Sequence, residues 1–397
     1  MIKISMEKKI VALVLLLIVF SGKTLLFSQQ STGALNAIQT VVPFLTIAPD
    51  SRAGAMGDAG VATSPDVYSQ HWNPAKFAFI DGNGGIGISY SPWLRNLVPD
   101  INIAYLAGYK RIDTRQVLSA SLLYSSLGAV PFTDDFGQLE RTFNPNEFSL
   151  DAGYSRLFSE NFSGGIAFRF IYSNLTGGSY SGGVATKPGI SFAADISGYY
   201  QKKISLFSKD GQLGLGLNFS NIGTKMSYST SQTADFIPMN MRLGTAATIN
   251  LDNFNKITVT LDLNKLLVPT PPVYSSISPD SIIAGKDPNV SVPVAIFQSF
   301  FDAPGGFKEE LHEITYSTGV EYWYNNQFAI RGGYFHENAT KGNRKYFTAG
   351  AGFRLKAFTL DFSYLMPLSQ NNPLAHTLRF SIAFDFNALR NASRSKA

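Results

Sequence analysis

The sequence predicts an all-β protein, namely a transmembrane antiparallel β-barrel of about 14 strands with an N-terminal plug segment in its lumen. Three observations support this fold class. Many segments of about ten residues alternate apolar and polar side chains, as a strand with two different faces does. The connections between these segments alternate between long and short. No apolar run in the 397 residues reaches the roughly 20 that a membrane-spanning helix needs.

Residues 1–30 have the layout of a secretory signal peptide. Lys3, Lys8 and Lys9 precede the apolar run IVALVLLLIVF, and small and polar residues follow it. The net charge of +5 falls to about +2 without this segment, so the basicity is largely targeting sequence. We therefore expect an exported protein, integral to the cell outer membrane, with no nucleic-acid partner. The absence of cysteine excludes a disulfide scaffold and a lipoprotein anchor.

Residues 31–83 precede the first strand and contain no run of period two. The alternation of the connections places their start on the periplasmic side. The stretch SRAGAMGDAGVATSPDVYSQHWNPA at 51–75 lacks the strand context, lysine and glycine spacing of a phosphate-binding loop. A lumen about 14 strands wide is too large for wall side chains to fill, so we expect this segment to be a plug or hatch. Its expected contacts with the lumen are made by Arg52, Asp58, Asp66, Trp72 and Asn73. Candidate partners on the wall are Arg169, Asp195, Glu321, Arg331, Arg354 and Arg379.

Residues 84–386 carry the predicted barrel. In TLRFSIAFDF, for example, Leu378, Phe380 and Ile382 share one face, and Arg379 and Ser381 lie on the other. Alternation alone does not separate a membrane barrel from a soluble sandwich. The expected strands lie at about 84–91, 101–110, 116–125, 146–156, 162–173, 188–200, 211–221, 239–250, 256–264, 313–324, 327–335, 346–355, 358–366 and 377–386.

The connections separate the two architectures. Every odd connection is long, and the even ones are short except QKKISLFSKD at 201–210. An outer-membrane barrel has this parity, with short periplasmic turns and long extracellular loops, and a sandwich has no reason to keep it. The longest loop is 265–312, and residues 387–397 form a periplasmic tail.

A family resemblance rests on TIAPDSRAGAMGDAGVATSPDVYSQHWNPAKFAF at 46–79. This run resembles the N-terminal region of the PorV family, the outer-membrane component of the type IX secretion system of Bacteroidetes. The family belongs to the wider FadL-like group of barrels, in which a related segment ends in Asn-Pro-Ala, here residues 73–75. The resemblance implies a plug folded into the lumen and a non-enzymatic role in protein transport. It also implies four partners: the giant type IX translocon barrel, secreted proteins with C-terminal signal domains, the sortase-like PorU attachment complex, and outer-membrane lipid.

If the resemblance holds, the long loops bind the translocon and cargo, which then passes to the cell-surface attachment complex. The candidate partner-binding residues are Phe297, Phe300, Phe301 and Phe307 in the 265–312 loop, with Tyr180 and Val184 in the Gly-rich loop 177–188. Aromatic anchors commonly carry interface energy. The alternative is that these aromatic residues pack the loop onto the barrel rim.

Two other functions are open to the sequence. A FadL-type transporter would import long-chain fatty acids or other hydrophobic compounds. Paired glycines such as 332–333 and 350–352 could mark the kinked strand of such a transporter, although packing also explains them. An enzyme is disfavoured, because the chain has four histidines, no G-x-S-x-G elbow and no metal-ligand spacing. We expect no catalytic residue, metal or cofactor.

Overall fold

The computed structural model describes residues 35–386 except 96, 97, 99, 134, 135, 179, 182, 183, 230–232, 279, 370 and 371. The chain divides into two compact units, Met1–Leu35 and Asn36–Ala397, and the described fold belongs to the second. The signal peptide expected at 1–30 and the tail expected at 387–397 lie outside the described residues.

Fourteen antiparallel strands close into one barrel, which confirms the predicted fold class. β1 pairs with β20, with Gly85 opposite Asp385 and Tyr90 opposite Phe380, so the sheet has no free edge. In barrel order the strands are β1 (Gly84–Pro92), β2 (Ile101–Arg111), β3 (Gln116–Leu127), β6 (Asn146–Leu157), β7 (Phe162–Asn174), β10 (Gly189–Leu206), β11 (Lys209–Gly223), β12 (Asn240–Asn250), β13 (Asn255–Leu266), β16 (Thr315–Tyr324), β17 (Phe328–His336), β18 (Lys345–Leu355), β19 (Phe358–Pro367) and β20 (Leu378–Asp385).

The outer face of the wall is apolar and the inner face is polar. On β20, Phe380 is 48% exposed, whereas its neighbours Arg379 and Ser381 are buried in the lumen. Ile330 on β17 and Phe362 on β19 are likewise exposed. A membrane barrel shows this arrangement, and a soluble sandwich shows the reverse.

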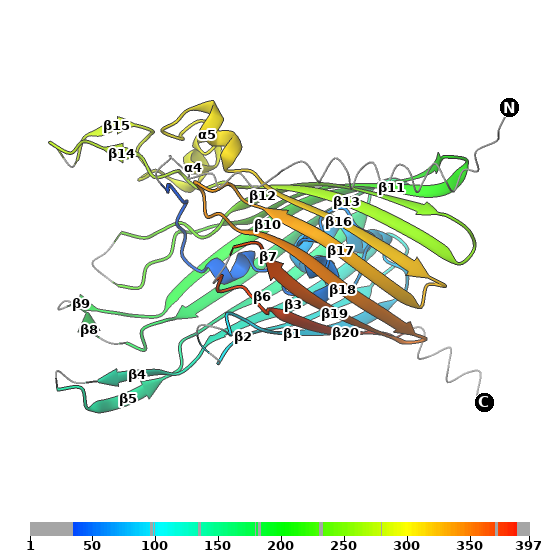
Figure 1. The fold of residues 1–397 in the computed structure, drawn as a ribbon, viewed down its shortest axis with the longest axis horizontal. Helices are drawn as coiled ribbons and strands as arrows, with labels where there is room; N and C mark the ends of the chain where they lie inside the picture. The colour runs from blue at the N-terminus through cyan, green and yellow to red at the C-terminus, as the bar shows by residue number, and fades with distance from the viewer. Residues whose placement is uncertain are drawn as a thin grey trace. The chain divides into compact units, whose positions relative to one another are not determined.

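The two ends of the barrel differ, as Figure 1 shows. The long connections gather at one end, here named the long-loop end, and tight turns join the strands at the other, the short-turn end. In the part of the chain that the structure describes, no helix is long and apolar enough to cross a membrane. The long connections contain β4 (Val130–Thr133), β5 (Leu139–Phe143), β8 (Tyr180–Ser181), β9 (Val184–Ala185), β14 (Val273–Tyr274), β15 (Ile282–Ala284), α4 (Val292–Gln298) and α5 (Phe307–His312).

One predicted connection is wrong. Residues 201–210 are not a longer loop, because β10 and β11 continue through them until Leu206 faces Lys209. Phe207 and Ser208 form the turn with φ of 53° and 59°, the left-handed conformation that a two-residue hairpin needs. The prediction failed because polar residues such as the exposed Lys202 interrupt the apolar alternation near this end of the strands. All connections at the short-turn end are therefore short.

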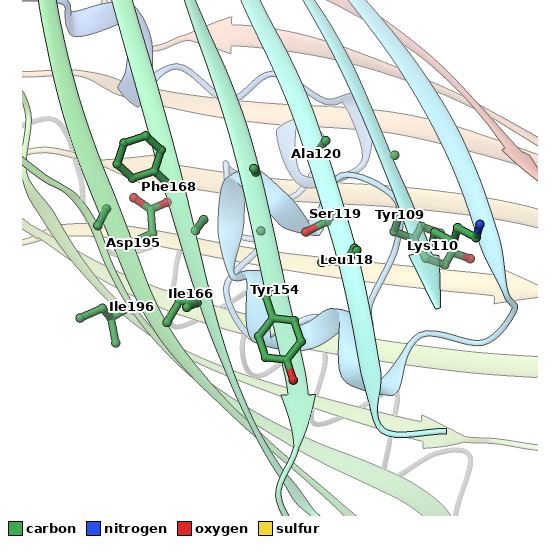
Figure 2. A pocket seen from close by; sticks show the side chains of 15 residues that line it. Tyr109, Lys110, Leu118, Ser119, Ala120, Tyr154, Ile166, Phe168, Asp195 and Ile196 are labelled. Carbon is green, nitrogen blue, oxygen red and sulfur yellow. The ribbon is translucent and has the colours of Figure 1, made fainter. Parts of the chain in front are cut away.

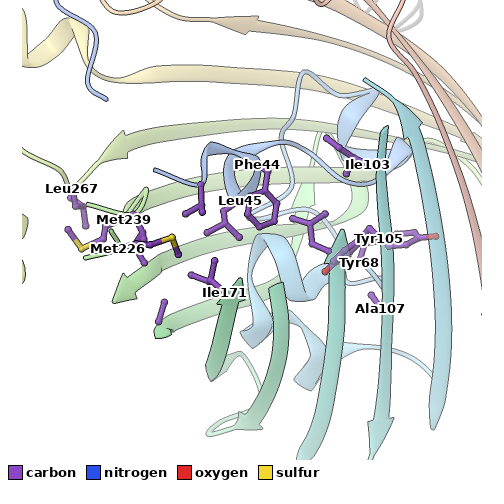
Figure 3. Packing of buried hydrophobic residues seen from close by; sticks show 14 of the residues in the cluster. Phe44, Leu45, Tyr68, Ile103, Tyr105, Ala107, Ile171, Met226, Met239 and Leu267 are labelled. Atoms are coloured by element: carbon purple, nitrogen blue, oxygen red, sulfur yellow. The ribbon is translucent and has the colours of Figure 1, made fainter. Parts of the chain in front are cut away.

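Residues 36–83 form a luminal segment, drawn in blue inside the barrel in Figure 1. It contains η1 (Pro43–Thr46), α2 (Ser51–Gly54), α3 (Ser69–Trp72) and η2 (Pro74–Phe79). α2 packs against β18, β19 and β20, and η2 packs against β3, β6, β7 and β10. Figure 3 shows the hydrophobic cluster that the segment forms with the wall, which includes Phe44, Leu45, Tyr68, Ile103, Tyr105, Ile171, Met226, Met239 and Leu267.

The luminal segment runs lengthwise through the barrel, so the expected start on the short-turn side is wrong for the described residues. At the long-loop end, the Asn36 amide donates to the Thr340 carbonyl at 2.9 Å and the Val41 amide donates to the Phe236 carbonyl at 3.1 Å. At the short-turn end, the guanidinium of Arg111 donates to carbonyl groups of residues 78–82. The parity of the connections fixes only the residues directly before β1, and a segment inside the lumen can cross it.

Candidate functional site

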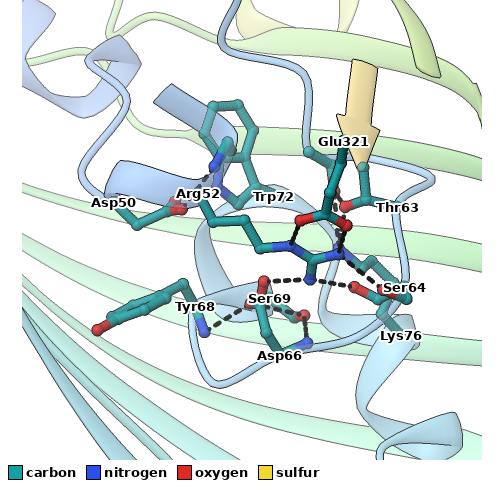
Figure 4. Close-up of polar contacts among 12 residues, drawn as sticks. Asp50, Arg52, Thr63, Ser64, Asp66, Tyr68, Ser69, Trp72, Lys76 and Glu321 are labelled. Atoms are coloured by element: carbon teal, nitrogen blue, oxygen red, sulfur yellow. Dashed lines mark hydrogen bonds and ion pairs between the residues drawn. The ribbon is translucent and has the colours of Figure 1, made fainter. Parts of the chain in front are cut away.

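Arg52 joins the luminal segment to the barrel wall (Figure 4). Its Nε and Nη2 donate to the two carboxylate oxygens of Glu321 on β16 at 3.0 and 2.9 Å, and its Nη1 donates to Asp66 at 2.9 Å. Glu321 also accepts from Arg331 at 2.7 Å, and Arg331 donates to Asp361 at 2.7 Å. These five residues form a continuous chain of alternating charges. Charges buried in this way need a partner each, so the chain holds the segment in one position.

The two acidic residues of the segment that we expected to meet lumen charges behave differently. Asp58 accepts from the Tyr346 hydroxyl at 2.5 Å, and its other oxygen lies 3.5 Å from Arg379 on β20. Asp66 pairs with Arg52, so its ion pair lies within the segment and reaches no wall charge. Asp66 therefore orients Arg52, whereas Asp58 contacts the wall itself.

Trp72 and Asn73 also contact the wall. The Trp72 carbonyl accepts from Asn218 on β11 at 2.9 Å, while its indole Nε1 donates to Asp50 of the segment at 2.6 Å. The Asn73 side-chain amide donates to the Gly198 carbonyl on β10 at 3.1 Å. The Asn-Pro-Ala ending thus lies against β10, where a backbone carbonyl of the wall accepts from it.

The remaining charges of the wall are not all directed at the segment. Arg169 pairs with Asp151 at 2.7 Å and with Asp195 at 3.2 Å, all three on strands. Arg354 lies over the Trp323 ring at 4.7 Å and donates to Thr359 at 3.4 Å. The segment is therefore held by a subset of the expected charges.

Glycines of the wall let the segment approach the strands closely. A Cβ added to Gly333 on β17 would collide with the backbone of Met56 and Gly57, and one added to Gly350 on β18 would collide with Ala55. β17 and β18 pair without a register shift through both glycines, so packing explains these positions and a kink is not needed. Other glycines of the wall that face backbone atoms of the segment in this way are Gly165, Gly214, Gly216 and Gly319.

Burial shifts the pKa values of Asp50 and Lys76 in the segment. Burial, with the negative charge of Asp66 adding to it, raises the pKa of Asp50 to about 6. Burial lowers the pKa of Lys76 to about 8, and its Nζ donates to the Gly60 carbonyl at 2.7 Å and to Thr63 at 3.1 Å. The sequence did not indicate that Lys76 is buried, because lysine is rarely fully buried.

The four candidate phenylalanines of the 265–312 loop are exposed. Phe297 and Phe307 are 71% and 78% exposed, and Phe300 and Phe301 are 42% and 59% exposed. They lie on or directly after α4 and at the start of α5, and we name them the aromatic patch. Phe300, the least exposed of the four, lies with its ring centroid 5.8 Å from the Nζ of Lys265 at the end of β13, so the roles of these rings in partner binding and in packing the loop stay predictions.

A buried group of charges anchors the same loop, and we name it the loop clasp. Lys265 at the end of β13 lies 3.0 Å from Glu310 and 2.6 Å from Glu313, and Lys341 from another loop lies 2.6 Å from Glu309 and 3.0 Å from Glu313. The Glu309 carboxylate also accepts from Asn36 of the luminal segment at 3.0 Å. The prediction did not include the clasp, although the run KEELHE in a long loop was a signal for paired acids.

The other candidate residues for partner binding lie in a second loop. Tyr180 is in β8 and Val184 is in β9, which pair with each other. Their side chains are outside the described residues, so their role stays a prediction. Metal binding has no candidate in the described part of the chain, where no group of three His, Cys, Asp or Glu side chains could hold an ion.

A concavity of about 870 Å³ lies on the outer wall across β2, β3, β6, β7 and β10 (Figure 2). Gly108, Ala120 and Ala152 lie opposite one another on neighbouring strands there, beside larger residues such as Leu118 and Ile166. The concavity belongs to the apolar outer face, and the residues of the loop clasp do not line it.

Comparison with solved structures supports the fold. A deletion mutant of the monoaromatic hydrocarbon channel TodX is 13% identical with a TM-score of 0.52, and the match covers 85% of this chain and 99% of that one. The Pseudomonas putida toluene transporter TodX is 11% identical (TM-score 0.48, 88% and 98% covered), and a Pseudomonas aeruginosa FadL homologue is 12% identical (TM-score 0.44, 89% and 100% covered). At this identity the likeness concerns the barrel fold alone.

Sequence comparison supplies the family. No curated protein matches the chain. The family model of the type IX secretion system protein PorV matches residues 29–273, which is more than half of the chain. The match includes the whole luminal segment with its Asn-Pro-Ala ending and the strands from β1 to β13. The chain, an outer-membrane β-barrel, therefore belongs to the PorV family of type IX secretion system proteins.

Proposed function

We propose that this protein is a non-enzymatic component of the type IX secretion system that works by binding. Its long-loop end binds the translocon barrel and the C-terminal signal domain of secreted substrates, and passes those substrates to the cell-surface attachment complex that contains PorU. The observation that carries the proposal is the aromatic patch, because four phenylalanines are exposed on a loop whose base is fixed by the loop clasp. Membership of the PorV family supports it.

The energetics of the aromatic patch favour a protein partner. Large apolar side chains exposed on one loop are candidates for an interaction site, and aromatic anchors supply much of the binding energy of an interface. The loop clasp lowers the entropic cost of binding, because the helices that carry the patch are already ordered. In this proposal the long-loop end is extracellular, and outer-membrane lipid surrounds the apolar wall.

The filled lumen supports a scaffold role for the barrel, with the luminal segment acting as its plug. Charges, hydrogen bonds and backbone-to-glycine contacts seat the segment against most of the wall. A FadL-type importer of fatty acids, the second candidate from the sequence, would require this seat to open during transport. Uptake of a long-chain fatty acid into liposomes that contain the purified protein would favour the importer.

Affinity purification from native outer membranes tests the proposal. The tagged chain is expected to recover a giant membrane barrel and secreted proteins with C-terminal signal domains. A variant with serine in place of Phe297, Phe300, Phe301 and Phe307 should lose them. Ile277→Ser is the matched control, because Ile277 is 91% exposed in the same loop but lies outside the patch.

A further inference from the structure

A cavity of about 540 Å³ lies inside the barrel at the long-loop end, between the luminal segment and the wall. We name it the vestibule. Its volume is in the range of small-ligand pockets, which are roughly 300–1,000 Å³. The segment contributes Ile38 and Trp72, β12 contributes Arg242, and the loops above it contribute Glu313 and Leu374.

Arg242 is the unusual residue of the vestibule. It is only 5% exposed, and in the described part of the chain its guanidinium makes one hydrogen bond, from Nη1 to the His71 carbonyl at 3.0 Å. It forms no ion pair with any carboxylate of the described residues. Its ring contact is with Trp72, whose centroid lies 5.1 Å away. Asp195, Asp262 and Asp58 act on Arg242 only at longer range, beyond ion-pair distance, so its guanidinium keeps donors free for an anionic ligand.

The acidic residues of the vestibule do not fill this role, because each has cations or donors of its own. Glu313 accepts from Lys265 and Lys341 at 2.6 and 3.0 Å. Glu337 accepts from Arg344 at 2.7 and 2.8 Å. Asp58 accepts from a tyrosine hydroxyl at 2.5 Å. Among the cationic side chains that line the described cavity, Lys341 and Arg344 have ion-pair partners and Arg242 has none.

The other residues that line the vestibule favour a peptide over a plain acyl chain as its ligand. Beside Arg242, one wall carries the amides of Asn240 and Asn264 and the hydroxyl of Ser317, whose buried Oγ has no hydrogen-bond partner. The lining also carries apolar groups, including Ile38 and Trp93. Amide and hydroxyl groups together with apolar side chains match a peptide, which presents both backbone amides and side chains.

From this arrangement we infer that the vestibule binds the carboxylate of a peptide segment from a protein partner. The guanidinium of Arg242 holds the carboxylate, Asn240, Asn264 and Ser317 bond the adjacent amide groups, and an apolar side chain lies against Trp93. Arginine suits this role because its planar donors match a carboxylate. The inference adds a ligand to the proposed function. It rests on that function only for the claim that the peptide comes from a secretion partner.

Calorimetry on the purified full chain in neutral detergent tests the inference. The probes are the N-acetylated tetrapeptide GAVL with a free C-terminus, the same peptide as its C-terminal amide, the amide of N-acetyl-GAEL, and decanoate. The free acid should bind, and the GAVL amide should bind at least about tenfold more weakly, because a charge-assisted hydrogen bond is lost. If the GAEL amide binds, the inference is supported, and the bound carboxylate can then come from a side chain.

Variants separate the site from general effects. The Arg242→Gln variant should bind the free-acid peptide about tenfold more weakly, and Arg242→Lys should recover part of that affinity. Arg354→Gln is the matched control, because Arg354 is another wall arginine without an ion pair among the described residues, and it does not line the vestibule. A shift in electrophoretic mobility on heating checks that each variant is folded.

Three results would overturn the inference: equal binding of the acid and both amides, equal affinity of Arg242→Gln and Arg354→Gln, or binding of decanoate without either carboxylate peptide. The assay contains no secretion partner. A failure here therefore leaves the affinity purification unaffected, and a failure of that purification leaves a measured peptide affinity intact.

Discussion

Arg52 of the luminal segment and Glu321 of β16 form a buried, two-pronged ion pair, with N–O distances of 2.9 and 3.0 Å. The pair connects residues 269 positions apart in the sequence and lies in a chain of charges that continues to Asp361. It is a charge-assisted link with two hydrogen bonds between the segment and the wall, so it contributes to how firmly the segment is held.

Removal of one partner should therefore be costly. Arg52→Ala leaves Glu321 with only Arg331, and Glu321→Gln leaves two arginines close together. Each change should destabilise the folded protein by about 3–5 kcal/mol, the usual cost of breaking a buried pair. The loss of stability is measured as a lower temperature at which the folded band disappears in heat-modification gels. In a double-mutant cycle the effects should be far from additive; additive losses would show that the two side chains do not interact.

A side chain at Gly333 should displace the luminal segment. Gly333→Val places a Cβ on the backbone of Met56 and Gly57, which cannot move aside as a flexible side chain can. The expected result is a larger single-channel conductance in planar bilayers. Gly332→Val is the control, because a Cβ there has no atom nearer than 3.9 Å. Equal conductance in both variants would contradict the seating of the segment.

The stability of the luminal segment should depend on pH through Asp50. Its folded-state pKa of about 6 lies above its ordinary value of 3.8, so between these values the native state binds more protons than the unfolded state. The free energy of unfolding should therefore fall as pH rises from about 4 to 6, by up to about 3 kcal/mol from this group. Denaturant titrations followed by tryptophan fluorescence measure the slope. Asp50→Asn should flatten it, and an unchanged slope in that variant would refute the assignment.

The loop clasp should control the order of the long loop without affecting the barrel. Glu313 accepts from both Lys265 and Lys341, so Glu313→Gln weakens both contacts at once. Limited proteolysis should then cut within residues 265–312 several-fold faster, while heat-modification of the barrel stays unchanged. Lys308→Met is the control, because Lys308 is exposed on α5 and takes no part in the clasp. The same rate of cleavage in both variants would argue against the clasp.

The sequence predicted the barrel well because a wall with lipid on one side and a polar lumen on the other imposes a strict period of two. Arg379 beside Phe380 illustrates this, since each side chain can satisfy its chemistry on one face only. Where that constraint ends, the prediction failed, as at the hairpin through Phe207 and Ser208. The charge partner of Arg52 was among the expected wall residues, but which of them it would meet depends on strand register.

Other parts of the site could not be read from one sequence. The loop clasp joins Lys265, Lys341 and Glu313 from separate parts of the chain, and no local pattern indicates that they meet. The burial of Lys76 and the lack of an ion-pair partner for Arg242 among the described residues likewise follow from how the segment fills the lumen. Local patterns specify the wall, whereas contacts across the lumen appear only when the barrel closes.

We propose that the long-loop end binds secretion partners through the aromatic patch. Quantitative mass spectrometry of affinity-purified native outer membranes tests it most directly, with Ile277→Ser beside the variant that carries serine at Phe297, Phe300, Phe301 and Phe307. We predict that the chain and Ile277→Ser recover the translocon barrel and cargo with C-terminal signal domains, and that the patch variant recovers at most about a tenth as much, since hot-spot losses exceed 1.4 kcal/mol. Equal recovery by the patch variant, or no secretion partner with the unaltered chain, would show that the aromatic patch does not bind these partners.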